Sequence, residues 1–162
     1  MKRFILLITA TLFFAFQIAV GSSAALDIPE PLRTVASNEA GDMVVMSNEE
    51  ITKGLKLFNE KCAECHKSGY TKTDPNVSLG AEDLAFATPP RDNLEALVDY
   101  LNNPTTYDGE IEISEFHAST KSADLFVKMR NVSQDDLRNM AGYILYEINQ
   151  RPDTWGCGKV CN

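Results

Sequence analysis

Hydrophobic residues recur at helical spacing in three stretches of this chain. The first stretch opens with Ser47 and Glu50, whose spacing is typical of a capping box at a helix N-terminus. Its apolar positions follow three or four residues apart, at Ile51, Leu55, Phe58 and Cys62. This pattern predicts a helix that begins near Ser47 and brings Cys62 to its C-terminal end.

Two further amphipathic stretches follow the same rules. Asp92 or Asn93 caps the middle one, and Pro104 ends it. Its apolar face is Leu94, Leu97, Val98 and Leu101. The last stretch opens with a second capping box, Ser133 with Asp136, and Pro152 lies beyond its end. Its apolar positions are Leu137, Met140, Ala141, Ile144, Leu145 and Ile148.

The remaining sequence predicts little regular structure. Residues 33–35 and 43–45 flank a turn-like segment at 38–42, which favours a short β-hairpin. Residues 67–80 are polar and read as a loop, while residues 82–87 predict a helical turn stopped by Pro89 and Pro90. We therefore expect a mainly α-helical fold with a short N-terminal β-hairpin and long loops.

The N-terminus has the pattern of a cleavable secretory signal. Lys2 and Arg3 precede an apolar run over residues 4–20, and small residues follow at 21–25. The run is shorter than the roughly 20 residues that a spanning helix needs, which disfavours an uncleaved anchor. We expect residues 1–25 to be removed and residues 26–162 to form a single domain, exported and not spanning a membrane.

Charge limits the choice of partners. Residues 26–162 hold thirteen basic and twenty-three acidic residues, so the mature chain carries a net charge of −10. This charge disfavours nucleic acid and anionic lipid as direct partners. The negative charge is equally consistent with docking on a basic protein surface and with a role in solubility alone.

The segment Cys62-Ala63-Glu64-Cys65-His66 carries the chemistry. C-x-x-C-H is the attachment signature of a c-type haem. Residues three apart share one face of a helical turn, so Cys62 and Cys65 can both reach the vinyl groups of one porphyrin. His66 then faces the iron as the proximal ligand. We expect one covalently bound haem c.

Two other interpretations use the same cysteines. A zinc site could combine Cys62 and Cys65 with Cys157 and Cys161. A thioredoxin-like redox pair requires a βαβ context that this sequence lacks. Neither explains the adjacent His66. An exported location also permits a disulfide between Cys157 and Cys161, while two free thiols remain open.

The second axial ligand of the iron has two candidates. The only other histidine is His117, and Met129 lies well after the attachment motif, as methionine ligands in cytochromes c do. Spacing alone favours His117 only slightly. A peroxidase-like enzyme needs an open iron face and a distal acid–base pair, for which no histidine remains if His117 is bound, so we expect no enzymatic activity.

Several segments resemble one family, the extrinsic low-potential cytochrome c subunit of photosystem II. They are residues 71–77 (TKTDPNV), 87–93 (ATPPRDN), 97–100 (LVDY), 103–109 (NPTTYDG), 112–115 (EISE) and 129–131 (MRN). The resemblance covers nearly the whole mature chain. It implies a class I-like cytochrome c fold around one haem, and it implies bis-histidine ligation in which His117 follows the Glu-Ile-Ser-Glu stretch.

The resemblance also implies a location and a role. Members of the family sit on the lumenal face of photosystem II beside other extrinsic subunits, so the expected location is the thylakoid lumen of a cyanobacterium or a plastid. There they help to hold the calcium and chloride that the manganese cluster needs for oxygen evolution. A soluble electron-carrier cytochrome c is the alternative. Two imidazoles lower the potential of a haem relative to His/Met ligation, which disfavours exchange with ordinary high-potential donors.

Two departures separate this chain from the pattern it resembles. Ala118 stands where the family usually has proline after the distal histidine. The C-terminus carries Cys157 and Cys161 where the family tends to have a glycine and a terminal aromatic pair. A divergent paralogue of the extrinsic subunit is therefore a further alternative.

Overall fold

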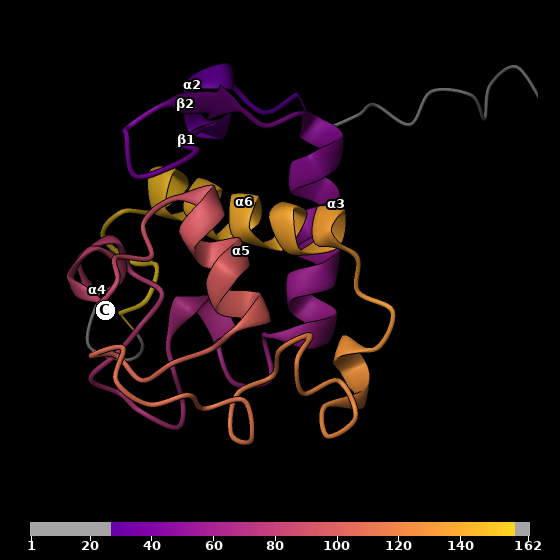
Figure 1. Ribbon diagram of the computed structural model, residues 1–162. Coiled ribbons are helices and arrows are strands. Elements are labelled where there is room, and N and C mark those ends of the chain that lie inside the picture. Colours follow the sequence, from indigo (N-terminus) through magenta and orange to yellow (C-terminus); the bar gives the residue numbers. More distant parts are fainter. Residues whose placement is uncertain (1–26, 158–162) are drawn as a thin grey trace, which may run out of the picture.

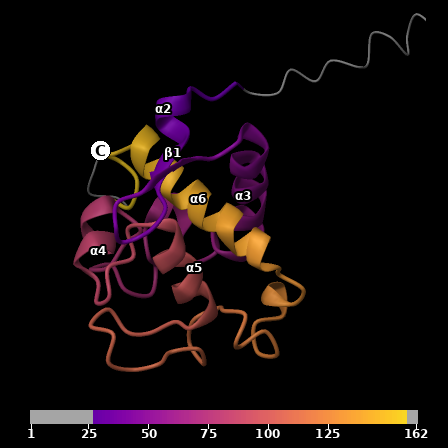
Figure 2. The same ribbon diagram turned by 45° about the horizontal axis from the view of Figure 1, so that its top comes forward.

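Two crossed helices form the centre of the molecule in the computed structural model, which describes residues 27–157. Helix α3 spans Asn48–Lys61 and helix α6 spans Gln134–Gln150. The N-terminal part of α6 crosses α3, as Figure 1 and Figure 2 show from two directions. Helix α5, Leu94–Asn102, packs against α6, and the short α4, Ala81–Phe86, lies to one side. The prediction of a mainly helical fold is confirmed.

Both predicted capping boxes are present, and they explain where the two long helices begin. The Ser47 hydroxyl accepts from the Glu50 N–H at 3.1 Å, while the Glu50 carboxylate accepts from the Ser47 N–H at 2.7 Å. The same reciprocal pair joins Ser133 and Asp136 at the start of α6. Between the two possible caps of α5 the structure selects Asn93, whose side chain accepts from the Ala96 N–H at 3.0 Å.

The small sheet is the predicted hairpin. Strand β1, Thr34–Ala36, pairs with β2, Met43–Val45, in an antiparallel register that places Val35 opposite Val44. A short helix α2, Glu30–Arg33, precedes it. The hairpin and α2 sit together at one end of the molecule, at the top of Figure 1.

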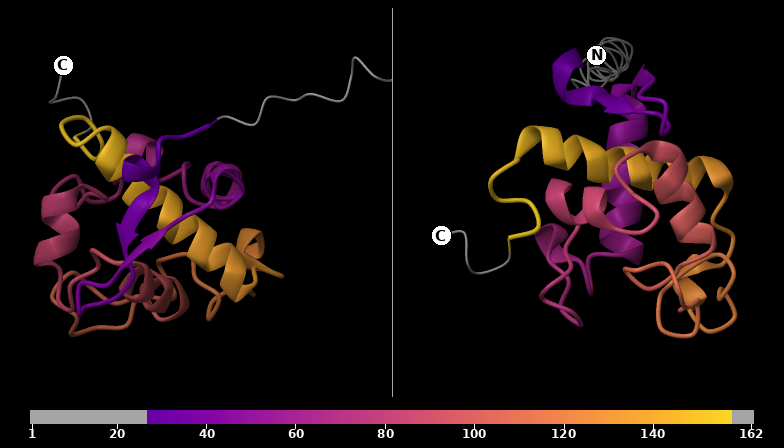
Figure 3. Two further views of the ribbon diagram at one scale, coloured as in Figure 1. Left: turned by 90° about the horizontal axis from the view of Figure 1, so that it is seen from above. Right: turned by 60° about the vertical axis from the view of Figure 1, so that its left-hand side comes forward.

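The opposite end consists of loops. Residues 103–133 and the segment that follows α3 run there with only two short 3-10 helices, η1 at Lys67–Gly69 and η2 at Val127–Met129 (Figure 1, Figure 3). An isolated antiparallel β-bridge pairs Thr105 with Glu112 in this region. This bridge was not predicted from the sequence. Four buried side chains under the loops form a small second core: Leu101, Met129, Leu137 and Met140.

The last described residues return to the segment after α3. Trp155 is buried, with its ring centroid 5.7 Å from that of Phe58 and 6.1 Å from that of Tyr143. The Gly156 N–H donates to the Ser68 carbonyl at 2.9 Å. At Gly69, where φ is +79°, an added Cβ would lie 2.7 Å from the Gly156 nitrogen, so this close approach requires glycine.

Several predictions concern residues outside the described range. The signal segment 1–25 and Cys161 are among them. Within residues 27–157, we find no helix that is both long and apolar enough to cross a membrane.

Candidate haem site

The attachment motif lies on a turn that continues α3. The helix ends at Lys61, one residue before the end that we predicted, but its hydrogen bonds run on. The Cys62 N–H donates to the Phe58 carbonyl at 2.8 Å, and the His66 N–H donates to the Cys62 carbonyl at 2.9 Å. The chain therefore stays coiled through the motif, which keeps both thiols on one turn with His66 directly after them.

Contacts from two distant segments hold this turn. The Lys72 N–H donates to the Cys65 carbonyl at 3.0 Å, and the Lys72 ammonium donates to the Glu64 carbonyl. The Glu64 carboxylate forms an ion pair with Lys128 of η2. Lys128 lowers the pKa of Glu64, first by this hydrogen bond and then by its charge. The turn is thus fixed from both sides.

The two thiols of the motif are free in the structure. Cys62 is half-buried and Cys65 is exposed. Burial, followed by the charge of Cys65, raises the pKa of the Cys62 thiol to about 12. Cys157 is disulfide-bonded, and residues 27–157 contain no group of three or more possible metal ligands. The described residues therefore do not support the zinc interpretation.

His66 is oriented by one neighbour. Its Nδ1 lies 3.2 Å from the Thr71 hydroxyl, so this ring nitrogen is occupied. Burial lowers the pKa of His66 and favours the neutral imidazole. A hydrogen bond at Nδ1 leaves Nε2 as the nitrogen available to a metal.

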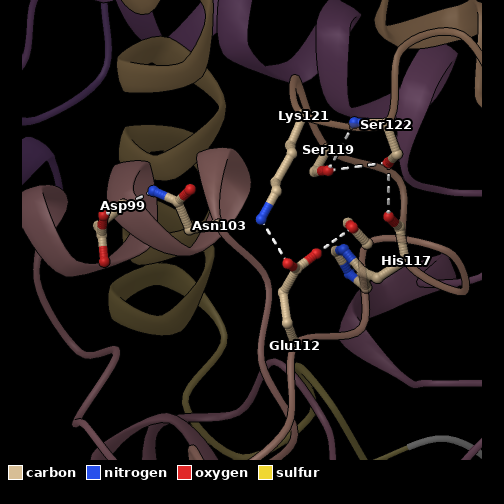
Figure 4. A network of polar contacts seen from close by, with 8 residues as sticks. Asp99, Asn103, Glu112, His117, Ser119, Lys121 and Ser122 are labelled. Atoms are coloured by element: carbon tan, nitrogen blue, oxygen red, sulfur yellow. Dashed lines mark hydrogen bonds and ion pairs between the residues drawn. The ribbon is translucent and has the colours of Figure 1, made fainter.

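His117 reaches the site from the long loop after α5. The Thr105–Glu112 bridge anchors this loop, and the His117 N–H donates to the Ile113 carbonyl at 2.8 Å. The Ser122 hydroxyl donates to the His117 carbonyl at 3.2 Å, and Figure 4 shows this contact within a polar network. Figure 4 also shows that Glu112 accepts from Lys121, which joins positions before and after His117 in the loop. Glu112 accepts from Ser114 as well.

The two imidazoles face one another across the loop end of the molecule. Their ring centroids are 6.1 Å apart and the ring planes meet at 53°. A metal bound by two imidazole nitrogens at about 2.0 Å each separates the two ring centres by roughly 6 Å. Burial, followed by the charge of His66, lowers the pKa of His117 to about 4, so His117 is neutral at neutral pH. The residues present therefore fit an iron held between them.

Met129 lies elsewhere in the packing. Its side chain is only 2% exposed and belongs to the small second core with Leu101, Leu137 and Met140. The structure brings together the two histidines that the sequence singled out, while Met129 fills a hydrophobic cluster.

Comparison with known proteins agrees with this geometry. The cytochrome c-550 domain family matches residues 26–162. The chain belongs to the cytochrome c-550 family. The chain is similar to two relatives that are each named photosystem II extrinsic protein V. The relative from Nostoc punctiforme is 50% identical over 98% of each chain. The relative from Aphanothece halophytica is 48% identical over 100% of this chain and 99% of the relative.

Solved structures place the fold in the same family. The crystal structure of cytochrome c549 matches with a TM-score of 0.78 and 57% identity, over 80% of this chain and all of that one. The PsbV2 cytochrome of Thermosynechococcus elongatus matches with a TM-score of 0.64 and 32% identity, over 76% and 87% of the two chains. The predicted class I-like cytochrome c fold and the resemblance are confirmed, and membership of the family implies that the chain binds haem c.

Three side chains near the histidines were not assigned a role from the sequence. Thr71 contacts His66, while Tyr100 packs edge-on against His117 with 5.0 Å between ring centroids. The guanidinium carbon of Arg91 lies over the Tyr100 ring, 4.0 Å from its centroid. All three lie in segments that carry the family resemblance, which is the only signal that could have pointed to them.

Proposed function

We propose that this chain carries one haem c, tethered by thioethers at Cys62 and Cys65, with His66 and His117 as the two axial ligands of its iron. The 6.1 Å separation of the two imidazoles is the observation that carries this proposal. The coiled turn that presents both thiols beside His66 supports it further. The bound haem would supply a one-electron ferric/ferrous couple whose potential is low because both ligands are imidazoles.

The protein residues have distinct tasks at this site. Thr71 fixes the ring of His66, and the hydrogen bonds of Ile113 and Ser122 fix the main chain of His117. Both imidazoles are kept neutral by burial, which ligation requires. With both axial positions taken by protein, the site is built to hold a haem and leaves no position for a substrate, so we propose no enzymatic activity.

We further propose that the chain acts as an extrinsic subunit of photosystem II on the lumenal side of the thylakoid membrane. Its relatives are named as photosystem II extrinsic proteins, and they match along the whole chain. In this role it would bind lumenal core domains and other extrinsic subunits and would help to retain the calcium and chloride of the manganese–calcium cluster. Residues 1–25 would serve as the export signal, with residues 26–162 as the mature monohaem domain.

Release and re-addition test this role. Washing isolated photosystem II with concentrated salt should release the chain and lower oxygen evolution, because the acidic mature chain would meet basic residues on the complex. Added calcium and chloride should restore part of the loss. Re-added protein should restore it even when a mediator clamps the potential so that the haem stays ferric.

The outcomes separate the alternatives. Restoration only under conditions that allow the haem to be reduced would favour the soluble electron carrier. A chain that does not fractionate with photosystem II at low salt would contradict the proposed partner and would leave a divergent paralogue or a carrier as the better description.

A further inference from the structure

Arg91 is a buried positive charge without an acidic partner in the described residues. Its side chain is only 7% exposed, and none of the ion pairs within residues 27–157 involves it. One guanidinium nitrogen, Nη2, donates to the Thr105 carbonyl at 3.3 Å, to the Thr105 hydroxyl at 3.2 Å and to the Thr106 carbonyl at 2.7 Å. All three acceptors are uncharged, so the positive charge is held in place without being neutralised.

Tyr100 connects this charge to the distal histidine. The guanidinium carbon of Arg91 lies 4.0 Å from the centroid of the Tyr100 ring, in cation–π contact. The same ring meets the His117 imidazole edge-on, with 5.0 Å between centroids. One aromatic ring therefore contacts both the positive charge and the candidate axial ligand.

A charge in this position is costly and weakly screened. Burial without a counter-charge disfavours a cation, and desolvation accordingly lowers the pKa of Arg91. A guanidinium nevertheless stays protonated in proteins. The surrounding protein has a lower dielectric constant than water, so the field of Arg91 reaches its neighbours more strongly than that of a solvated arginine.

We propose that Arg91 is a positioning and tuning residue that raises the reduction potential of the haem held by His66 and His117. Ferric haem carries one more positive charge than ferrous haem, so a fixed positive charge nearby favours the ferrous form. Arg91 thereby opposes the lowering of the potential that two imidazole ligands produce. This inference rests on the proposed ligation, and it goes beyond it by naming a residue that sets the potential.

Spectroelectrochemical titration of the holoprotein tests the proposal, with an electrode supplying the one electron that converts ferric into ferrous haem. Arg91→Gln and Arg91→Met should each shift the equilibrium about tenfold toward the ferric form, which lowers the midpoint by about 59 mV. Arg91→Lys retains the charge and should recover most of the parent midpoint. The spectra of all variants should remain low-spin, because no iron ligand is changed.

Arg33 provides a matched control. It also donates to main-chain carbonyls, those of Ile28 and Met46, and it has no ion pair within the described residues. It belongs to α2, at the end of the molecule opposite the loops (Figure 1). Arg33→Gln changes the net charge by the same unit and should leave the midpoint unchanged.

The results also distinguish a failure of this proposal from a failure of the proposed ligation by His66 and His117. A parent protein that is not low-spin would contradict the ligation itself. A low-spin parent whose two neutral variants keep its midpoint would contradict the role of Arg91, as would an Arg91→Lys midpoint as low as that of Arg91→Gln. If both neutral variants fail to assemble with haem while Arg91→Lys succeeds, Arg91 has a structural role only, and the tuning proposal is wrong.

Discussion

His66 and His117 are held by different kinds of contact. The Nδ1 of His66 has the Thr71 hydroxyl as its partner, whereas the Nδ1 of His117 is buried without one. The position of His117 depends instead on its main-chain bonds and on the edge-on contact with Tyr100. A ring without a hydrogen bond at its second nitrogen is less firmly oriented. Of the two proposed ligands, His117 is therefore the one at which the site should be easier to open.

The first prediction concerns this ligand. His117→Ala should convert the ferric holoprotein from low-spin to high-spin iron, because a side chain without a donor atom replaces the distal imidazole. Met129→Leu is the matched control and should keep the low-spin spectrum. It exchanges side chains of similar volume in a packed cluster, so its cost in unfolding free energy should stay below about 1.5 kcal/mol. Visible absorption spectra at constant pH measure the outcome. A low-spin His117→Ala protein together with a high-spin Met129→Leu protein would show that Met129, and not His117, is the distal iron ligand.

Two glycines, one in α3 and one in α6, lie in close contact with neighbouring segments but in different settings: Gly54 faces α6, and Gly142 faces Met46, which precedes α3. A Cβ added at Gly54 would lie 2.1 Å from the Asn139 carbonyl oxygen and 2.8 Å from the Tyr143 Cβ. A Cβ added at Gly142 would meet the terminal methyl of Met46 at 2.4 Å. The main chain of α6 cannot move away locally, whereas the end of a methionine side chain can change its rotamer.

The second prediction follows from this difference. Gly54→Ala should lower the unfolding free energy of the holoprotein by about 1–3 kcal/mol or more, because the helices must separate to admit the methyl group. Gly142→Ala should cost less, since alanine gains up to about 1 kcal/mol in helix propensity and Met46 can adjust. Urea unfolding followed by circular dichroism gives both values. Equal costs would show that the crossing is more adaptable than its geometry indicates.

The third prediction concerns the N-terminus of α6. Lys53, followed by the Ser133 main-chain N–H, lowers the pKa of Asp136 to about 2 in the folded protein. A group with a lowered folded pKa stabilises the protein above its unfolded pKa, near 3.8, and this stabilisation is lost as the pH falls toward about 2. Asp136→Asn should therefore lower the unfolding free energy by about 1 kcal/mol at neutral pH. The difference in unfolding free energy between this variant and the parent should disappear as the pH falls from about 4 to about 2.

Asp135→Asn is the control for that titration. Asp135 is an exposed carboxylate in the same turn but lies outside the capping box. Asp135→Asn makes the same change in formal charge as Asp136→Asn. It should lower the unfolding free energy by less, because both capping hydrogen bonds remain. Unfolding curves at several pH values measure both variants, and identical pH profiles would contradict a specific role for the capping carboxylate.

At the scale of the whole molecule, the loop end lacks a regular framework of its own. Residues 103–133 contain only the short η2 and an isolated bridge, and large hydrophobic side chains such as Phe116 and Leu125 are exposed there. An apolar macrocycle tethered beside this region would add the hydrophobic surface that the loops themselves do not provide.

The fourth prediction tests this contribution. Cys62→Ser combined with Cys65→Ser should yield little stable exported protein, because the haem would no longer be tethered to the turn. Single substitutions should be less severe, since one thioether remains. Immunoblots of the exported fraction and haem staining measure the outcome. Normal amounts of folded double variant would show that the chain completes its core without the cofactor.

Features that depend on neighbouring residues were predicted from the sequence, whereas features that depend on contacts between distant segments were not. The starts of α3, α5 and α6 follow from local caps and periodicity, so they were predicted within a residue or two. The pairing of the two imidazoles depends on how a long loop returns to the end of α3, and spacing alone left Met129 as an alternative. The environment of Arg91 was not predictable, because its acceptors Thr105 and Thr106 lie 14 and 15 residues further along the chain, beyond helix α5 and Pro104.

The contact between Trp155 and the segment after the attachment motif has a consequence for biogenesis. The segment that contains Gly69 is closed by residues that lie much later in the sequence, so translation delivers them well after the turn with Cys62 and Cys65. The contact between Gly156 and Ser68 can form only once both segments have been synthesised. The order of synthesis therefore leaves the segment after the proposed attachment turn open until the region of Trp155 follows it.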